Sequence, residues 1–334
     1  MSNTFPFAAI VGQEDMKLAM ILTAIDPKIG GVLVFGDRGT GKSTAVRGLA
    51  SLLPPINSVA GCPVNSRSLD EIPPWSENTS KKITEIPMPV VDLPLGIGSD
   101  RVTGALDIEK ALVEGVKSFQ PGLLAKANRG YLYIDEVNLL EDHIVDLLLD
   151  VSQSKENVIE REGLSIRHAS DFILIGSGNP EEGELRPQLL DRFGLSVEVV
   201  TPQTVKDRIE IIKRRDLFDQ DPEKFHNKWA KEDKKICKKI IAAKKRINQI
   251  ETPESILELC AEICIKLGSD GLRGELTLLR AARALSAFIK SEHVSEQHVK
   301  NVASMCLSHR LRRDPLDETG SASRVERALH AVCG

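Results

Sequence analysis

The stretch VLVFGDRGTGKSTAVR, residues 32–47, decides the fold, because it joins an apolar run, a glycine-rich turn and the start of a helical pattern. Its first residues, Val32–Phe35, are uninterruptedly apolar, which is typical of a strand covered on both faces in a parallel sheet. Gly36–Ser43 then fits G-x-x-x-x-G-K-[ST], the pattern of a phosphate-binding loop. The sequence therefore predicts an α/β fold that binds a nucleotide at this turn.

The chemistry of phosphate binding explains the spacing within the turn. Glycines let successive backbone N–H groups point at phosphate oxygens, and the helix that follows adds the positive end of its dipole. We expect Lys42 to reach the β- and γ-phosphates, and Ser43 to place its hydroxyl on Mg²⁺.

Composition limits the class of protein without choosing its function. The chain has 334 residues, enough for two domains, and a net charge of −4 with a pI near 6.0. That balance argues against a molecule that binds polyanions over its whole surface, but it leaves room for a local basic patch. No apolar run approaches the roughly 18 residues of a membrane span, and Met1–Phe7 lacks the features of a signal peptide. We expect a soluble, intracellular protein.

The cysteines and histidines predict neither a disulfide framework nor a metal site. Six cysteines are scattered without a C-x-x-C pair, so reduced thiols are expected. Cys260 and Cys264 lie four apart in a helical pattern, and we interpret them as core residues. His143 and His168 are isolated and are interpreted as surface or hydrogen-bonded residues.

A second apolar strand, Tyr131–Ile134, ends in two carboxylates, Asp135 and Glu136. Such a strand is the partner that a phosphate-binding loop requires. Asp135 can hold Mg²⁺ and its waters, while Glu136 can orient and deprotonate the water that attacks the γ-phosphate.

A hairpin and a third strand follow. Residues 157–168 alternate about Glu162-Gly163 as a β-hairpin does. Phe172–Gly176 is apolar and leads to Asn179, which we expect at a strand's carboxyl end as a polar sensor of the nucleotide. Ser177 lacks the G-x-S-x-G elbow, which excludes a serine hydrolase.

Two other segments have distinct compositions. Residues 56–93 are rich in proline and weakly periodic, which indicates an insertion or a partner-facing segment, in which Trp75 either covers its own loop or is an exposed contact. Ala105–Glu114 is expected to be helical.

Beyond residue 200 the pattern is helical, and we predict a P-loop domain over residues 1–200 and an all-α lid over residues 201–334. The predicted lid helices are Lys206–Arg215, Pro253–Leu267, Gly274–Lys290 and Glu296–His309. Residues 224–246 are strongly basic, as a solvated helix face or a docking surface for an acidic partner would be.

The order of the motifs is typical of an AAA+ ATPase, with Asp191-Arg192 standing before a further apolar strand. Longer stretches make the chain resemble the I subunits of magnesium chelatase over nearly its whole length. These stretches are Phe7–Met20, Gly36–Thr44, Val90–Gly96, Pro121–Asp150, Gly176–Glu198, Leu267–Ala287 and Leu307–Glu318.

The resemblance implies an AAA+ ring that couples ATP hydrolysis to insertion of Mg²⁺ into protoporphyrin IX, toward chlorophyll or bacteriochlorophyll. It implies a D subunit as the partner ring and an H subunit that holds the porphyrin, in a bacterial cytoplasm or a plastid stroma. It also implies that Asn179 is sensor 1, Arg192 the arginine finger and Arg273 the sensor 2 arginine. The residues it implies for ATP binding are Gly36, Asp37, Arg38, Gly39, Thr40, Gly41, Lys42, Ser43 and Thr44.

An arginine finger has an independent physical reason. The charge that develops on the transferred phosphoryl group exceeds what one lysine and one Mg²⁺ neutralise, and an arginine supplies roughly 10³-fold or more in rate. If Arg192 acts on a neighbouring copy, a closed ring is expected, most often a hexamer. The alternative for Arg192 is an interface salt bridge, and Arg273 could act on its own or a neighbouring site.

Two other classes of function share this machinery. One is a remodelling chaperone of the MoxR type or a cobaltochelatase-type ATPase, which would act on another client. The other is a nucleic-acid motor whose hairpin grips phosphates, although the mixed charge of residues 157–168 does not favour DNA.

Overall fold

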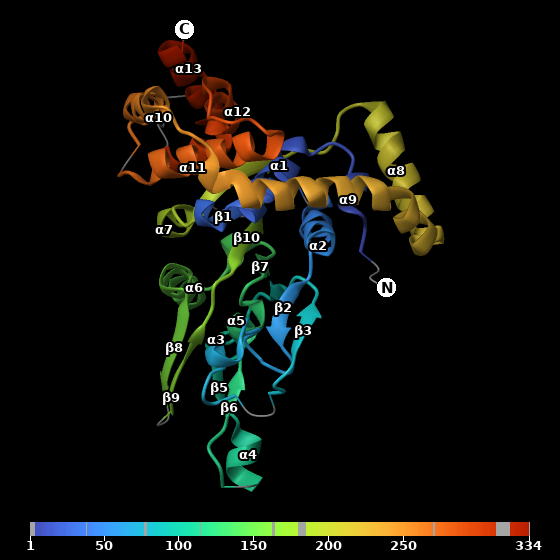
Figure 1. Cartoon of the computed structure of the whole chain (residues 1–334), viewed down its shortest axis with the longest axis vertical. Coiled ribbons are helices and arrows are strands. Elements are labelled where there is room, and N and C mark those ends of the chain that lie inside the picture. The colour runs from blue at the N-terminus through green and yellow to red at the C-terminus, as the bar shows by residue number, and fades with distance from the viewer. Residues whose placement is uncertain are drawn as a thin grey trace. The chain divides into compact units, whose positions relative to one another are not determined.

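The stretch around the predicted phosphate loop folds as a strand, a turn and a helix in the computed structural model (Figure 1). β1 (Gly31–Gly36) is buried along most of its length, and α2 (Lys42–Leu52) begins at the lysine of the loop. The structure describes residues 4–37, 39–76, 79–113, 115–161, 164–179, 185–269, 271–311 and 321–333. Arg38, which was predicted to bind the nucleotide, lies outside these ranges.

Parallel strands occur in each of two compact units. In the unit of residues 46–184, β7 (Tyr131–Ile134) pairs in parallel with both β10 (Ile173–Gly178) and β4 (Val90–Leu93). In the unit of residues 5–45 and 185–334, β1 pairs in parallel with β11 (Phe193–Val199). The predicted α/β fold with a parallel sheet is confirmed, and the predicted boundary at residue 200 stays a prediction.

The apolar strands lie where their composition predicts. All four residues of β7 are buried, as expected of a parallel strand covered on both faces. The register pairs Tyr131 with Ile173 and Ile134 with Gly176. The carboxyl ends of β7 and β10 therefore lie together, and the residues that follow them are neighbours.

The unit of residues 46–184 contains more regular structure than the sequence predicts. Its remaining elements are β2 (Ile56–Val59), η3 (Leu69–Glu71), β3 (Ile83–Ile86), α3 (Ser99–Thr103), β5 (Gly104–Leu106), α4 (Ile108–Val113), β6 (Phe119–Pro121), α5 (Leu123–Ala127), η4 (Val137–Leu139), α6 (Asp142–Ser154), β8 (Glu156–Arg161) and β9 (Leu164–Ala169). β2 and β3 pair as an antiparallel hairpin inside the predicted insertion.

The expected helix at Ala105–Glu114 is wrong in its first part. Ala105 belongs to β5, which pairs with β6, and the helix α4 starts only at Ile108. The pairing partner lies about fifteen residues further along the chain, so the strand depends on a non-local contact that a helical pattern does not reveal.

The predicted hairpin is confirmed, with β8 and β9 side by side in antiparallel register (Figure 1). Its turn, residues 162–163, lies outside the described residues. At its base Asn157 Nδ2 donates to Thr103 O at 2.8 Å and lies 3.0 Å from His168 Nε2. Burial lowers the pKa of His168. His168 is thus a hydrogen-bonded structural residue, as expected, and His143 is exposed.

Trp75 covers its own segment. Its ring packs against the buried side chains of Val59, Cys62 and Val64 and lies 4.7 Å from the Phe119 ring, centroid to centroid. This contact links the insertion to β6.

The other unit carries the helical part of the chain. Its elements beyond β1 and β11 are η1 (Phe7–Ala9), α1 (Glu14–Ile25), η2 (Pro27–Ile29), α7 (Pro187–Leu190), α8 (Val205–Gln220), α9 (Pro222–Arg246), η6 (Ile247–Gln249), α10 (Glu254–Leu267), α11 (Arg273–Ile289), α12 (Glu296–Leu307), η7 (Ser308–Arg310) and α13 (Ser321–Cys333). α11 packs against α9, α10 and α12 (Figure 1). The predicted lid helices are confirmed, and α9 accounts for the basic stretch.

α9 shows how the sequence starts a helix. The Asp221 side chain caps the helix by accepting a hydrogen bond from Lys224 N at 2.9 Å. Pro222 occupies the first turn, where a backbone N–H would have no partner within the helix, so the N–H that proline lacks is not needed.

All six cysteines are free thiols, as predicted. Cys260 and Cys264 lie in the core of the helical part, with exposed fractions of 2% and 1%. Across the described residues, no helix is both long and apolar enough to cross a membrane.

Candidate functional site

The predicted phosphate loop has the backbone shape of an anion cradle. Gly36, Gly39 and Gly41 have positive φ angles of 144°, 79° and 85°, which glycine adopts at little cost. At Gly36 a side chain would also collide with the Val199 carbonyl of the paired strand. Because α2 begins at Lys42, its first N–H groups and the positive end of its dipole lie at this turn.

Lys42 folds back into the cradle. Its Nζ donates to Gly36 O at 2.5 Å and lies 3.3 Å from Asp37 O, and Thr40 Oγ1 donates to the same Asp37 carbonyl at 2.9 Å. The ammonium group is thereby held over the turn, where phosphate oxygens can take the place of the carbonyls.

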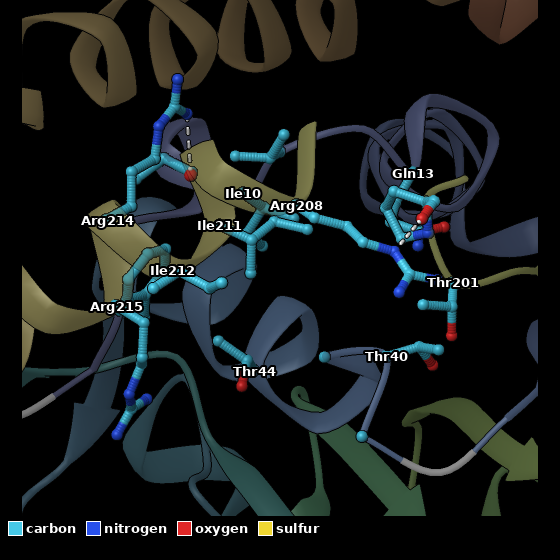
Figure 2. Close-up of a pocket in the computed structure, with 16 residues that line it drawn as sticks. Ile10, Gln13, Thr40, Thr44, Thr201, Arg208, Ile211, Ile212, Arg214 and Arg215 are labelled. Carbon is cyan, nitrogen blue, oxygen red and sulfur yellow. Dashed lines mark hydrogen bonds between the residues drawn. The ribbon is translucent and has the colours of Figure 1, made fainter. Parts of the chain in front are cut away.

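A cavity of about 440 Å³ opens beside the cradle, wholly within the unit of residues 5–45 and 185–334 (Figure 2). Figure 2 shows Thr40 and Thr44 on one side, facing Ile211 and Ile212 of α8 on the other. The segment 5–13 closes a third side. Three arginines of α8 also line the cavity: Arg208, Arg214 and Arg215.

Hydrogen bonds fix the walls of this cavity. Arg214 Nη1 donates to Ala9 O at 2.9 Å (Figure 2). The Arg214 guanidinium lies 4.5 Å from the centroid of the Trp229 ring. Ala8 N donates to Asp233 Oδ1 at 2.8 Å, and burial raises the pKa of Asp233. The N-terminal segment is therefore tied to both α8 and α9.

Sequence reasoning missed these walls. Neither residues 5–13 nor α8 has a spacing that indicates a nucleotide, and the apolar residues of α8, such as Ile212, are the only sequence signal for this wall; Ile212 is 66% exposed in the structure. An apolar cavity with a few polar groups that opens onto a phosphate cradle fits a nucleotide.

Asp135 is exposed, but one of its carboxylate oxygens accepts hydrogen bonds from two side chains of the protein. Oδ1 accepts from Tyr133 OH at 3.0 Å and also from Ser177 Oγ. Burial raises the pKa of Tyr133, so its hydroxyl stays a donor.

Glu136 has a backbone conformation that is uncommon for any residue except glycine. Its φ of 53° and ψ of 54° are left-handed, and they turn the chain from β7 into η4, whose Leu139 N donates to Glu136 O at 2.9 Å. Strained backbone of this kind is concentrated at functional sites.

The structure brings three of the predicted residues together at one edge of the sheet. Asp135 and Glu136 follow β7, and Asn179 follows β10, its parallel neighbour. Lys42 and Ser43 belong to the other compact unit.

The two predicted arginines lie at one junction of the helical part. Arg192 immediately precedes β11, and Arg273, the first residue of α11, forms an ion pair with Asp191. Arg310 joins them, donating to Asp191 Oδ1 at 2.8 Å and to Phe193 O at 3.0 Å. Asp191 therefore links two lid arginines to the segment that carries Arg192.

The groups available for a cation suit Mg²⁺ that arrives with a nucleotide. Among the described residues, no cluster of three or more His, Cys, Asp or Glu could hold a metal by itself. Mg²⁺ needs no such cage, because it uses one or two protein oxygens together with phosphates and water. The exposed Asp135 carboxylate and the Ser43 hydroxyl are groups of that kind.

Comparisons with known proteins agree over the whole chain. Residues 106–206 match the family model described as magnesium chelatase, subunit ChlI, and residues 257–329 match an AAA lid domain. The magnesium-chelatase 38 kDa subunit of Cereibacter sphaeroides is 66% identical over 332 residues, covering 99% of both chains. The ChlI subunit of Euglena gracilis is 50% identical, covering 98% of this chain and 96% of its own.

Solved structures also match. One chain from a cryo-EM-based structure of the complex between subunits BchI and BchD of magnesium chelatase is 62% identical, with a TM-score of 0.58, and the match covers 98% of this chain and 100% of that one. A proposed ATPase from Cytophaga hutchinsonii gives a TM-score of 0.67 at 16% identity, with 97% and 91% coverage, a likeness of fold alone.

Proposed function

The chain belongs to the family of magnesium chelatase I subunits, and on that premise we propose that it hydrolyses ATP to drive insertion of Mg²⁺ into protoporphyrin IX. The observation that carries the proposal is the glycine cradle around Lys42, which opens directly onto a nucleoside-sized cavity in the same compact unit.

The cradle binds the phosphates of ATP. Backbone N–H groups between Gly36 and Thr44 take the phosphate oxygens, and Lys42 exchanges its carbonyl partners for the β- and γ-phosphates. The base enters the cavity, where Ile10, Ile211 and Ile212 offer apolar surface.

Hydrolysis requires a cation and a base. Ser43 and Asp135 would hold Mg²⁺, which would supply positive charge to the phosphates, while Glu136 orients the attacking water and takes its proton. Asn179 senses the γ-phosphate from the end of the neighbouring strand.

Arg192 completes the site of a neighbouring copy. An arginine supplied in trans stabilises the charge of the transition state, and this requires a head-to-tail ring, which we propose to be a hexamer. Arg273 acts as sensor 2, leaving Asp191 when nucleotide binds.

The ring works with two partners, a D subunit that forms a second AAA+ ring and an H subunit that holds the porphyrin. ATP hydrolysis changes the shape of the ring, which allows the H subunit to desolvate Mg²⁺ and insert it. The site of action is a bacterial cytoplasm or a plastid stroma. The chaperone and nucleic-acid motor alternatives gain no support, because the relatives that match over nearly their full length are chelatase subunits.

Reconstitution tests the function. Purified D and H subunits should convert protoporphyrin IX to its Mg²⁺ complex only when this chain and ATP are present, as followed by porphyrin fluorescence. Lys42→Ala should abolish insertion, whereas Lys266→Ala, a charge change of the same kind at an exposed position of α10, should leave it intact. Insertion at an equal rate without this chain would refute the proposal.

Mixing variants tests the shared site. Arg192→Ala and Glu136→Gln chains should each be inactive, but a mixture should recover part of the ATPase activity, because some interfaces join an intact Arg192 to an intact Glu136. A mixture as inactive as its components would argue against action in trans.

A further inference from the structure

We propose that Tyr133 and Ser177 position the Asp135 carboxylate for Mg²⁺, by binding one of its oxygens and leaving the other for the cation. The inference rests on the proposed role of Asp135 and adds two positioning residues to it.

The three side chains form a closed triangle of hydrogen-bonding distances. Tyr133 OH donates to Asp135 Oδ1 at 3.0 Å, Ser177 Oγ donates to the same oxygen, and the two hydroxyl oxygens lie 3.0 Å apart. Each hydroxyl carries one proton, and both protons can go to Oδ1 at once. Oδ1 is thus occupied by two donors.

The strands dictate this arrangement. Tyr133 lies on β7, and Asp135 is the first residue after that strand ends at Ile134. The register pairs Ile134 with Gly176, so the residues that come next, Asp135 and Ser177 of β10, are also neighbours. Two corners of the triangle, Tyr133 and Ser177, therefore stand on strands of one parallel pair.

Burial makes the two hydroxyls a fixed part of the protein. Tyr133 is 5% exposed and Ser177 is 1% exposed, whereas Asp135 is exposed. Within the described part of the chain, every hydrogen bond given to the Asp135 side chain reaches Oδ1. Oδ2 is consequently the oxygen left to meet solvent or a cation.

Hydrogen bonds to a carboxylate that ligates a metal have a known physical effect. A carboxylate whose rotation is already restricted by hydrogen bonds loses less conformational entropy when it binds a metal. Loss of such hydrogen-bond partners typically lowers metal affinity or activity roughly 10- to 100-fold. Tyr133 and Ser177 touch neither substrate nor cation in this scheme, so they act through Asp135.

Two substitutions test the inference, each removing one hydroxyl and no other polar atom: Tyr133→Phe and Ser177→Ala. Tyr131→Phe is the matched control for the first, because Tyr131 is a buried tyrosine on the same face of the same strand. Ser170→Ala is the control for the second, since Ser170 is equally buried and donates to Leu124 O.

The main measurement is equilibrium binding of a fluorescent ATP analogue at increasing Mg²⁺ concentration, which needs no turnover. We expect Tyr133→Phe and Ser177→Ala to raise the half-saturating Mg²⁺ concentration about 10-fold each. Affinity for the analogue in excess EDTA should be unchanged, and both controls should match the wild-type chain.

The same substitutions in an Asp135→Asn background separate positioning from a structural role. If the hydroxyls act through Asp135, their effect on Mg²⁺ dependence disappears in that background. The inference is overturned if the two variants bind Mg²⁺ and nucleotide as the controls do, or if their effects persist once the carboxylate has been replaced by the amide. If Asp135→Asn itself leaves the Mg²⁺ dependence unchanged, the proposed role of Asp135 falls as well.

Discussion

The cavity beside the phosphate cradle makes a quantitative prediction at Ile212. This side chain lines the cavity and is 66% exposed, so it has apolar surface that a base can cover. Ile212→Ala removes most of that surface without opening a hole in the core.

The magnitude follows from the exposed fraction. Burying a whole isoleucine side chain contributes about 1.5–3 kcal/mol, and two thirds of this, for a side chain 66% exposed, is about 1–2 kcal/mol. Since about 1.4 kcal/mol corresponds to a tenfold change, Ile212→Ala should weaken nucleotide binding about 5- to 30-fold.

Titration of a fluorescent ATP analogue measures the change directly. Ile209→Ala is the matched control, because Ile209 lies one turn away on α8, is 46% exposed and does not line the cavity. Both variants should keep the wild-type melting temperature. Equal affinities for Ile212→Ala and the wild-type chain, or an equal loss in Ile209→Ala, would refute this placement of the base.

Three further predictions concern stability and reactivity. Burial lowers the pKa of His309 to about 3, so between about 6.5 and that value only the unfolded chain binds the extra proton. The stability from this group is complete above about pH 6.5 and falls by up to about 1.4 kcal/mol per pH unit as the pH drops through the range. Urea titrations at pH 7 and pH 5 should find a smaller fall in His309→Gln. Gly36→Ala should destabilise the chain by at least about 2 kcal/mol and abolish nucleotide binding, because the added methyl group stands at a positive φ and collides with the neighbouring strand. Gly98→Ala places its methyl group in open space and should change neither the melting temperature nor nucleotide binding. Burial raises the pKa of the Cys264 thiol to about 12, so iodoacetamide at pH 8 should label the partly exposed Cys237 before Cys264. Peptide mass spectra measure the two labelling rates, and equal rates would contradict the burial of Cys264.

The parts of the site that sequence reasoning located are local. The cradle around Lys42 and the carboxylates after β7 are contiguous stretches in which a residue type, its spacing and the flanking strand all carry the chemistry. The hairpin over residues 157–168 was also predictable, since the alternation and the turn lie within one short stretch.

The parts it missed join segments far apart in the chain. Ile10 and Ile211 line one cavity although about 200 residues separate them, and nothing in either stretch indicates that the two residues meet. The contact of Ser177 with Asp135 depends on the register of two strands, which the sequence of either strand does not specify. Ala105 was placed in a helix for the same reason, since only its pairing with β6 makes it a strand residue.

The central claim is that hydrolysis of ATP by this chain, and not binding alone, drives Mg²⁺ insertion. The most direct measurement is the rate of Mg²⁺-protoporphyrin formation by reconstituted I, D and H subunits in which this chain carries Glu136→Gln and still binds the fluorescent ATP analogue. We predict normal binding with no insertion. Insertion at the wild-type rate by that variant would contradict the account.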